Sequence, residues 1–336
     1  MSVTAIGFIG LFFLFLFLIL RMPVAMAMLV VGFVGTWVVN GTVPALTSLS
    51  GEAFEIISYS ELIVIPLFVL MGNLAGVSGM SRDLYTAAYK WIGHFRGGLA
   101  SATIVGCAGF AAMSGSSIAA AVTMGRVALP EMKRFNYSDS LATGAVAAGG
   151  TLGILIPPST GMIIYAILTE QSIGKLFIAG VLPGILLTAL FIFAISIVTR
   201  LDPAKGPAGP KTSFGEKLSS LRNASTIVGV VLVTIGGIYV GWFTPVEAAG
   251  VGAFIVLVIA LVRQELDWKS SKFVVFQTLR TTATVFMILI GAHVFIPFMA
   301  LTEIPEDLVK FLIGLDVGDL GILIIILLTY VVLGTF

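Results

Sequence analysis

The sequence predicts an all-α polytopic membrane protein. Of its 336 residues, 58% are hydrophobic and only 10% are charged, whereas soluble domains carry about 25% charged residues. The apolar residues form runs close to the roughly 20 residues that a helix needs to cross a bilayer. The basic residues are dispersed between these runs, and the net charge is +1. The lipid bilayer is therefore the expected partner, and nucleic acid is not.

Residues 1–200 form an N-terminal half. Its predicted elements, in order, are scaffold helices within 1–78, an interfacial helix at 80–96, a re-entrant hairpin at 98–125, a broken helix at 140–169 and a helix at 174–199. The first apolar run, Val3 to Leu20, follows no basic residue and precedes no small-residue cleavage site. It is therefore predicted to be a membrane helix and not a signal peptide. Segment 41–59 is predicted to be an external loop.

Residues 201–222 are predicted to form a cytoplasmic linker, because repeated Gly-Pro pairs interrupt regular structure there. The C-terminal half, 223–336, contains apolar runs at 224–242, 245–263, 281–301 and 318–336. Thr244 is followed by Pro245 and, three residues on, by Glu247. This spacing predicts a helix start with a capping box. It favours a structural role for Glu247 over a role as a coupling-proton carrier.

The basic residues predict the orientation, because Lys and Arg favour the cytoplasmic side of a membrane. The run 98–125 has Arg96 before it and Arg126 after it. A single crossing would place one of these charges outside. A hairpin that enters and leaves on the cytoplasmic side, with its tip at 114–117, keeps both inside. With 41–59 outside, 16 of the 18 Lys and Arg residues are cytoplasmic and the N-terminus is predicted to be outside, which is the periplasmic side if the protein is bacterial.

Two polar stretches interrupt the apolar sequence, and we interpret them as the substrate and ion site of a transporter. Glycines and prolines break helices and free backbone groups. In lipid, such backbone must be buried in protein or line a wet cavity. Hydroxyls and freed carbonyls suit an alkali cation, and amides at a helix start suit an anion. The candidate residues are Ser114, Gly115, Ser116 and Ser117, then Gly149, Gly150, Thr151 and Gly153, then Pro157, Pro158, Ser159 and Thr160.

Each stretch alone has a structural alternative. Small residues such as Ser and Gly commonly let membrane helices approach closely, and a proline commonly only kinks a helix. The charges that flank the hairpin, and the combination of Gly, Pro and hydroxyl residues, favour a site. An intramembrane enzyme is not predicted, because the apolar runs lack paired Asp residues, a Ser–His pair and an HExxH motif. A channel, whose flux would need no sodium gradient, is a further alternative. No cofactor is expected.

The two halves echo each other weakly. Gly97 to Ser114 parallels Gly318 to Gly334, and opposite entry of the two segments would make an inverted repeat, as in many secondary transporters. On this alignment Gly334 and Thr335 are the tip of a second hairpin. We therefore expect an incomplete second repeat and a sequence that is a C-terminally truncated portion of a longer protein.

Five runs carry a resemblance to a known family. They are Ile65-Pro66-Leu67-Phe68-Val69-Leu70-Met71-Gly72, Arg96-Gly97-Gly98-Leu99-Ala100, Met113-Ser114-Gly115-Ser116-Ser117, the segment 147–159, and Phe243-Thr244-Pro245-Val246-Glu247-Ala248-Ala249. Together they resemble the large, DctM-like membrane subunit of TRAP (tripartite ATP-independent periplasmic) transporters. The resemblance covers the whole chain, and the runs at 113–117 and 147–159 are specific to the family in combination.

The resemblance implies a sodium-driven, elevator-type importer in the bacterial inner membrane. Its substrate would be an organic acid, such as a C4-dicarboxylate or sialic acid, and its partners a periplasmic binding protein and a small four-helix membrane subunit. The implied Na⁺ site contains Ser114, Ser116, Ser117, Gly150 and Gly153, with a remnant of a second site at Gly334 and Thr335. The alternative is a divalent-anion/sodium symporter that needs no binding protein.

Overall fold

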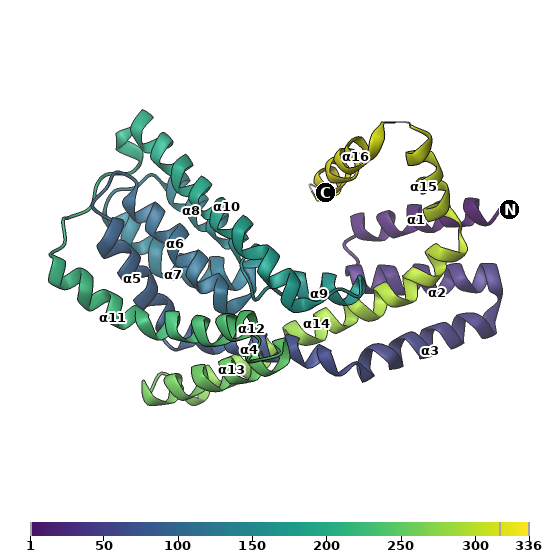
Figure 1. Cartoon of the computed structure of the whole chain (residues 1–336), viewed down its shortest axis with the longest axis horizontal. Helices are drawn as coiled ribbons and strands as arrows, with labels where there is room; N and C mark the ends of the chain where they lie inside the picture. The colour runs from purple at the N-terminus through teal and green to yellow at the C-terminus, as the bar shows by residue number, and fades with distance from the viewer. Residues whose placement is uncertain (1, 316, 335–336) are drawn as a thin grey trace. The chain divides into compact units, whose positions relative to one another are not determined.

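The computed structural model describes residues 2–315 and 317–334, and this described part contains helices and loops without a strand (Figure 1). Six helical segments in it are long and apolar enough to cross a membrane: Ser60–Val77, Asp139–Leu168, Ile173–Leu201, Phe214–Val240, Pro245–Val262 and Trp268–Leu301. The predicted class of an all-α polytopic membrane protein is therefore confirmed. The inverted repeat stays a prediction.

The chain divides into two compact units, a smaller unit of residues 1–59 and 284–336 and a larger unit of residues 60–283. The helix α14 (Trp268–Leu301) contributes to both. The predicted interfacial helix, hairpin and broken helix all lie in the larger unit. The candidate site at 114–117 and 149–160 can therefore be described within that one unit.

The smaller unit contains α1, α2, α3, the second part of α14, α15 and α16. Their bounds are Val3–Ile19, Val24–Asn40, Thr42–Ser58, residues 284–301, Ile304–Gly314 and Gly318–Leu333. The helices α2 and α14 pack closely, since a Cβ on Gly32 would lie 2.6 Å from the carbonyl oxygen of Val294. His293 of α14 approaches Glu52 of α3 at 3.4 Å. The prediction of a loop at 41–59 is wrong, because its polar residues belong to the amphipathic helix α3. The external location of this segment stays a prediction.

The larger unit begins with η1 and ends with the first part of α14. Between them lie α4, α5, α6, α7, α8, α9, α10, η2, α11, η3, α12 and α13. The bounds from η1 to α13 are Ser60–Ile63, Val64–Val77, Met80–Ile92, Gly98–Ser114, Ser117–Arg134, Asp139–Leu155, Thr160–Leu168, Ile173–Leu201, Pro203–Lys205, Phe214–Val231, Leu232–Gly236, Gly237–Val240 and Pro245–Val262. The helices α6 and α7 form a hairpin, and α8 packs along both arms (Figure 1). The helix α4 packs against α6 and α13, and α5 packs against α6 and α11.

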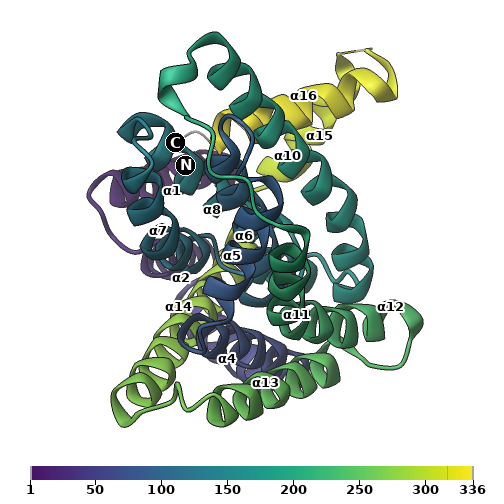
Figure 2. The ribbon, with the colours of Figure 1, turned by 90° about the vertical axis from the view of Figure 1, so that its left-hand side faces the viewer.

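Residues 202–213, the α10–α11 connection, are shorter and more ordered than the predicted linker at 201–222. The helix α11 begins at Phe214, where Ser213 and Glu216 form a capping box. Upstream, the Gly97 N–H donates to the carbonyl oxygen of Gly206 at 2.9 Å, and the Gly209 N–H donates to that of Gly93 at 2.9 Å. Figure 2 shows the connection passing along α5 and α6 before it enters α11. The connection is therefore bonded to the start of the hairpin.

The predicted capping box at the start of α13 is confirmed. The Glu247 N–H donates to Thr244 Oγ1 at 3.3 Å, and the Thr244 N–H donates to Glu247 Oε2 at 2.8 Å. These two bonds satisfy donors that a helix start leaves without partners. By contrast, α14 begins at Trp268, before the apolar run predicted at 281–301. Its first turns carry Lys269 and Lys272, which a hydropathy pattern does not count as part of a membrane helix.

Candidate functional site

The tip of the hairpin is a turn of two residues between two helix ends. The helix α6 ends at Ser114, and α7 begins at Ser117. Gly115 has φ +58°, in the left-handed region that favours glycine. Ser116 is the N-cap of α7, and its Oγ accepts a hydrogen bond from the Ala119 N–H at 3.3 Å. The sequence Gly-Ser is thus the local reason why the chain reverses here.

The break in the predicted helix 140–169 lies at residues 156–159, between α8 and α9. Pro157 and Pro158 lack the amide hydrogen that would continue the ladder of α8, and both are buried. Ser159 is the N-cap of α9, and its Oγ accepts from the Met162 N–H at 3.3 Å. The break therefore ends one helix and starts another in the space of four residues.

Hydrogen bonds join the hairpin tip to this break. The carbonyl oxygen of Gly115 accepts from the Thr160 N–H at 3.3 Å and from Thr160 Oγ1 at 3.0 Å. On the opposite side of the turn, a Cβ on Gly153 would lie 2.7 Å from the Ser117 nitrogen and 2.8 Å from the Ser116 carbonyl oxygen. Only a residue without a side chain permits this approach of α8 to the tip. The two polar stretches, 32 to 46 residues apart in sequence, therefore form one structural site.

Two hydroxyls at this site are buried without a hydrogen-bond partner. They are Ser114 Oγ, on a residue only 3% exposed, and Ser117 Oγ. A buried hydroxyl without a partner costs roughly 1–3 kcal/mol, and native proteins rarely tolerate it without a ligand, an ion or water. Ser116 and Ser159, in contrast, use their hydroxyls to cap helices. The two unpartnered oxygens are therefore free to take a ligand.

The helix ends give the site both signs of partial charge. The C-termini of α6 and α8 present carbonyl oxygens, which favour a cation, and the N-termini of α7 and α9 present amides, which favour an anion. Each end carries an effective charge of roughly half an elementary charge, and the effect falls off within one turn. A small cation beside an organic anion matches this arrangement.

Not every predicted site residue lies at the tip. Gly149 faces α6 two turns away from the tip, where its Cβ would lie 2.7 Å from Cys107 Sγ. Thr151 is exposed and donates to the carbonyl oxygen of Ala148 in its own helix at 2.7 Å. Gly334 follows α16 in the smaller unit, and Thr335 lies outside the described residues. Gly150 packs at the start of α7, with a Cβ position 3.2 Å from the Ser117 carbonyl oxygen.

One residue at the site was missed by sequence reasoning. Gly72 of α4 supports the tip from a third direction, since a Cβ there would lie 2.5 Å from the Cα of Ser114 and 3.0 Å from its carbonyl oxygen. Its sequence signals were its place inside an apolar run and at the end of the run 65–72, which resembles the family. Such a glycine marks a close helix contact without naming the partner helix.

The fold and the site define a class: an all-α polytopic membrane protein in which a helical hairpin meets a broken helix at a polar point. Residues 11–336 match the family described as tripartite ATP-independent periplasmic transporter, DctM component. The chain therefore belongs to this family, whose members are bacterial multi-pass transporter subunits and not enzymes.

The chain is also similar in sequence to individual TRAP transporter permeases. The chain is 36% identical over 293 residues to the C4-dicarboxylate TRAP transporter large permease protein DctM of Pseudomonas aeruginosa, covering 87% of this chain and 68% of that protein. It is 33% identical over 323 residues to the isethionate TRAP transporter permease protein DctMQ of Oleidesulfovibrio alaskensis, covering 96% and 50%. It is 32% identical over 277 residues to the sialic acid TRAP transporter large permease protein SiaM of Vibrio cholerae, covering 82% and 64%. The chain thus spans between half and about two thirds of the length of these relatives.

Proposed function

We propose that this chain is part of the membrane subunit of a sodium-coupled secondary importer of organic acids. The observation that carries the proposal is the pair of buried, unpartnered hydroxyls of Ser114 and Ser117, beside the carbonyl-bearing C-termini of α6 and α8. Neutral oxygens of this kind are hard ligands, which suit a hard cation. Sodium entry supplies energy, since one charge crossing the membrane gains about 2.3 kcal/mol per 100 mV.

The substrate in this proposal is a small organic anion. The names of the three relatives refer to C4-dicarboxylate, isethionate and sialic acid, which are all acids. The N-termini of α7 and α9 offer amides to such an anion, and a bound cation next to them adds to the attraction. The cation and the anion therefore stabilise each other's binding, which is the physical basis of coupled transport.

The transport step in this proposal is an elevator movement in the bacterial inner membrane. The hairpin and the α8–α9 pair move together as a rigid body, because the bonds between Gly115 and Thr160 join them. The partners are a periplasmic binding protein, which delivers the acid, and a small four-helix membrane subunit. The family description supports both a periplasmic component and a tripartite assembly.

Uptake by the assembled transporter in proteoliposomes tests the proposal. We expect accumulation of a C4-dicarboxylate or sialic acid only when a sodium gradient and the binding protein are both present. Uptake that persists without the binding protein would contradict the tripartite mode and favour a binding-protein-independent symporter. Flux that needs no sodium gradient would contradict coupling and favour a channel.

A pair of matched variants tests the location of the site. Gly150→Leu places a side chain where even a Cβ would lie 2.7 Å from the Cβ of Ala121, so we expect sodium-dependent uptake to be lost. Gly144→Leu lies in the same helix with nothing within 4 Å of its Cβ position, so uptake should remain near the parent rate. Equal uptake by both variants at equal expression would refute the location.

A further inference from the structure

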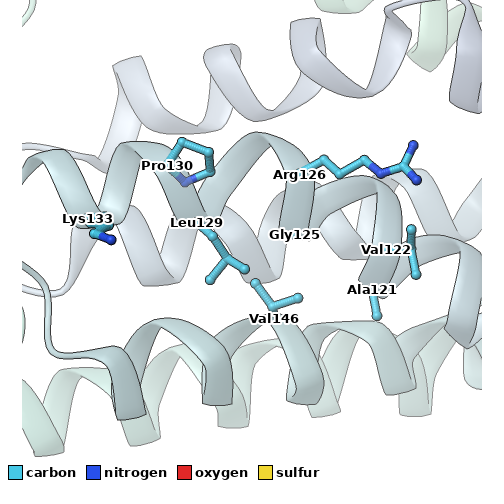
Figure 3. Close-up of a pocket in the computed structure, with 8 residues that line it drawn as sticks. All are labelled: Ala121, Val122, Gly125, Arg126, Leu129, Pro130, Lys133 and Val146. Atoms are coloured by element: carbon cyan, nitrogen blue, oxygen red, sulfur yellow. The ribbon is translucent and has the colours of Figure 1, made fainter.

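A groove runs along α7 where it packs on α8, away from the hairpin tip (Figure 3). Its volume is ≈ 630 Å³. Most of its lining is apolar or small, and the lining residues are Ala121, Val122, Gly125, Arg126, Leu129, Pro130, Lys133 and Val146. Figure 3 shows Leu129 of α7 and Val146 of α8 pointing toward each other, with Arg126 and Lys133 at separate positions along α7. The groove is therefore lined mainly by apolar side chains and carries two basic ones.

The two basic side chains of the groove have no acidic partner within the described residues. Arg126 and Lys133 are both exposed, and the ion pairs formed there join other residues. The nearest acid in sequence, Glu131, lies 4.0 Å from Arg134 instead. A charge beside apolar surface is costly without a counter-charge. An anionic ligand with an apolar body would neutralise these two charges and cover the apolar lining of the groove.

The positions of Arg126 and Lys133 along α7 limit which anionic ligand can contact both side chains. Lys133 is the penultimate residue of α7, at the base of the hairpin, and Arg126 lies seven residues closer to the tip. At 1.5 Å per residue, the two Cα positions are roughly 10 Å apart along the helix. A membrane helix end lies near the head groups, and a long Arg side chain can extend toward them from below. Figure 3 shows the Arg126 side chain extending along α7 away from Lys133, toward Val122. Rotation of its side-chain torsions toward the base of the hairpin would bring both charges to one phosphate in the head-group layer.

We infer that this groove binds one anionic phospholipid, with its phosphate at Arg126 and Lys133 and an acyl chain along Ala121, Gly125 and Val146. A water-soluble anion would gain nothing from the apolar lining. An apolar helix of another protein would cover Arg126 without neutralising it. An anionic phospholipid satisfies both the charges and the apolar surface. Basic pockets between membrane helices on the cytoplasmic side are a known form of lipid recognition.

Native mass spectrometry of the full chain, with added phosphatidylglycerol or phosphatidylcholine of identical acyl chains, tests the inference. We expect preferential binding of phosphatidylglycerol. Arg126→Gln and Lys133→Gln should each weaken it about fivefold, the effect of one basic residue near a membrane surface. Arg134→Gln is the matched control, because it removes the same charge from the same helix end outside the groove. Val122→Phe should weaken binding by filling the groove without changing any charge, and it tests the groove independently of the charge variants.

Three outcomes would overturn the inference. Equal losses in Arg126→Gln and Arg134→Gln would show that only net charge matters. Competition by millimolar glycerol phosphate would indicate a site for a soluble anion. Finally, Val122→Cys should react with a maleimide in the lipid-free assembled transporter, because Val122 is 48% exposed. The native Cys107 is buried and should not react. Protection of Val122→Cys without lipid would show that protein covers the groove.

Discussion

Four serines at the site, Ser114, Ser116, Ser117 and Ser159, have two different physical roles. The hydroxyls of Ser116 and Ser159 each accept from a backbone N–H and cap a helix. The hydroxyls of Ser114 and Ser117 are buried and accept from nothing. The first pair builds the turns, and its loss would disturb the fold. The second pair costs stability unless a ligand is bound, which makes it the more direct probe of function.

Ser114→Ala and Ser117→Ala should therefore separate stability from ion binding. We expect each variant to raise the ion-free free energy of unfolding by about 1 kcal/mol, because an unsatisfied buried hydroxyl is removed. The stabilisation by sodium, about 2.7 kcal/mol at 100 times the dissociation constant, should largely vanish. Thermal unfolding in NaCl and in choline chloride at equal ionic strength measures both. Thr151→Ala, on the exposed face of α8, should keep the full sodium response; an unchanged response in the two serine variants would contradict the ligand role.

Gly153 is the residue whose substitution should separate α8 from the hairpin tip. In Gly153→Ala the new Cβ would lie 2.7 Å from the Ser117 nitrogen, closer than van der Waals contact allows. Overpacking of this kind costs roughly 1–3 kcal/mol, and the helix must shift away from the proposed ion site. We expect a lower melting temperature together with a weaker sodium response. Gly144→Ala in the same helix meets nothing within 4 Å and serves as the control, and it should be neutral or slightly stabilising because Ala is a better helix former than Gly. A loss as large in that variant would show that contact with the hairpin tip is not the cause.

The sequence predicted which two stretches meet at the candidate site, although it did not predict the contacts of each residue. Glycines, prolines and hydroxyls inside apolar sequence indicate broken helices, whichever way the side chains face. Sequence could not show that Thr151 bonds within its own helix or that Gly149 faces Cys107. Those outcomes depend on the rotation of α8 against the hairpin. For the same reason, the support of Ser114 by Gly72 appears only in three dimensions.

At the scale of elements, the α10–α11 connection shows where a composition rule fails. Gly and Pro predict irregular backbone, and the backbone is indeed irregular from 206 to 213. This irregular backbone is nevertheless held by hydrogen bonds to the rest of the unit. The Lys205 carbonyl accepts from the Ser138 N–H at 3.0 Å, and Thr212 Oγ1 donates to the Lys90 carbonyl at 2.5 Å. The glycines allow close contact with α5 and α6 as much as they allow a turn. Sequence alone could not distinguish the two uses.

Limited trypsin digestion tests whether this connection is fastened. We expect slow cleavage after Lys205 and Lys211, although both side chains are exposed. In Gly209→Ala the Cβ would lie 2.8 Å from the Gly93 carbonyl oxygen, which should open the connection and speed cleavage about tenfold, as a loss of about 1.4 kcal/mol implies. Gly215→Ala, where nothing lies within 4 Å, should leave the rate unchanged. Rapid cleavage of the parent chain would show that the connection is open.

At the scale of the whole molecule, hydropathy and charge predicted different features of the chain. Hydropathy predicted the class, because 58% hydrophobic residues leave only a membrane environment. It missed α3 and the first turns of α14, whose polar residues dilute the apolar signal. The charge pattern predicted the hairpin at 98–125, and the structure has a helix, a turn and a helix there. Which side of the membrane each loop faces is predicted from the charge pattern alone, because helix packing does not define a membrane plane.

Cysteine accessibility in intact cells tests that orientation directly. The one native cysteine, Cys107, is buried and should stay unreactive. Ser50 and Ser140 are both exposed on the chain, and the charge pattern puts 41–59 outside and the Arg134 end of the hairpin inside. We therefore expect a membrane-impermeant maleimide to label Ser50→Cys in intact spheroplasts and Ser140→Cys only after permeabilisation. Labelling of both from outside would mean that 98–125 crosses the membrane once. The reverse pattern would mean that the whole chain is inverted, with most of its 18 basic residues in the periplasm, against the bias that governs membrane insertion.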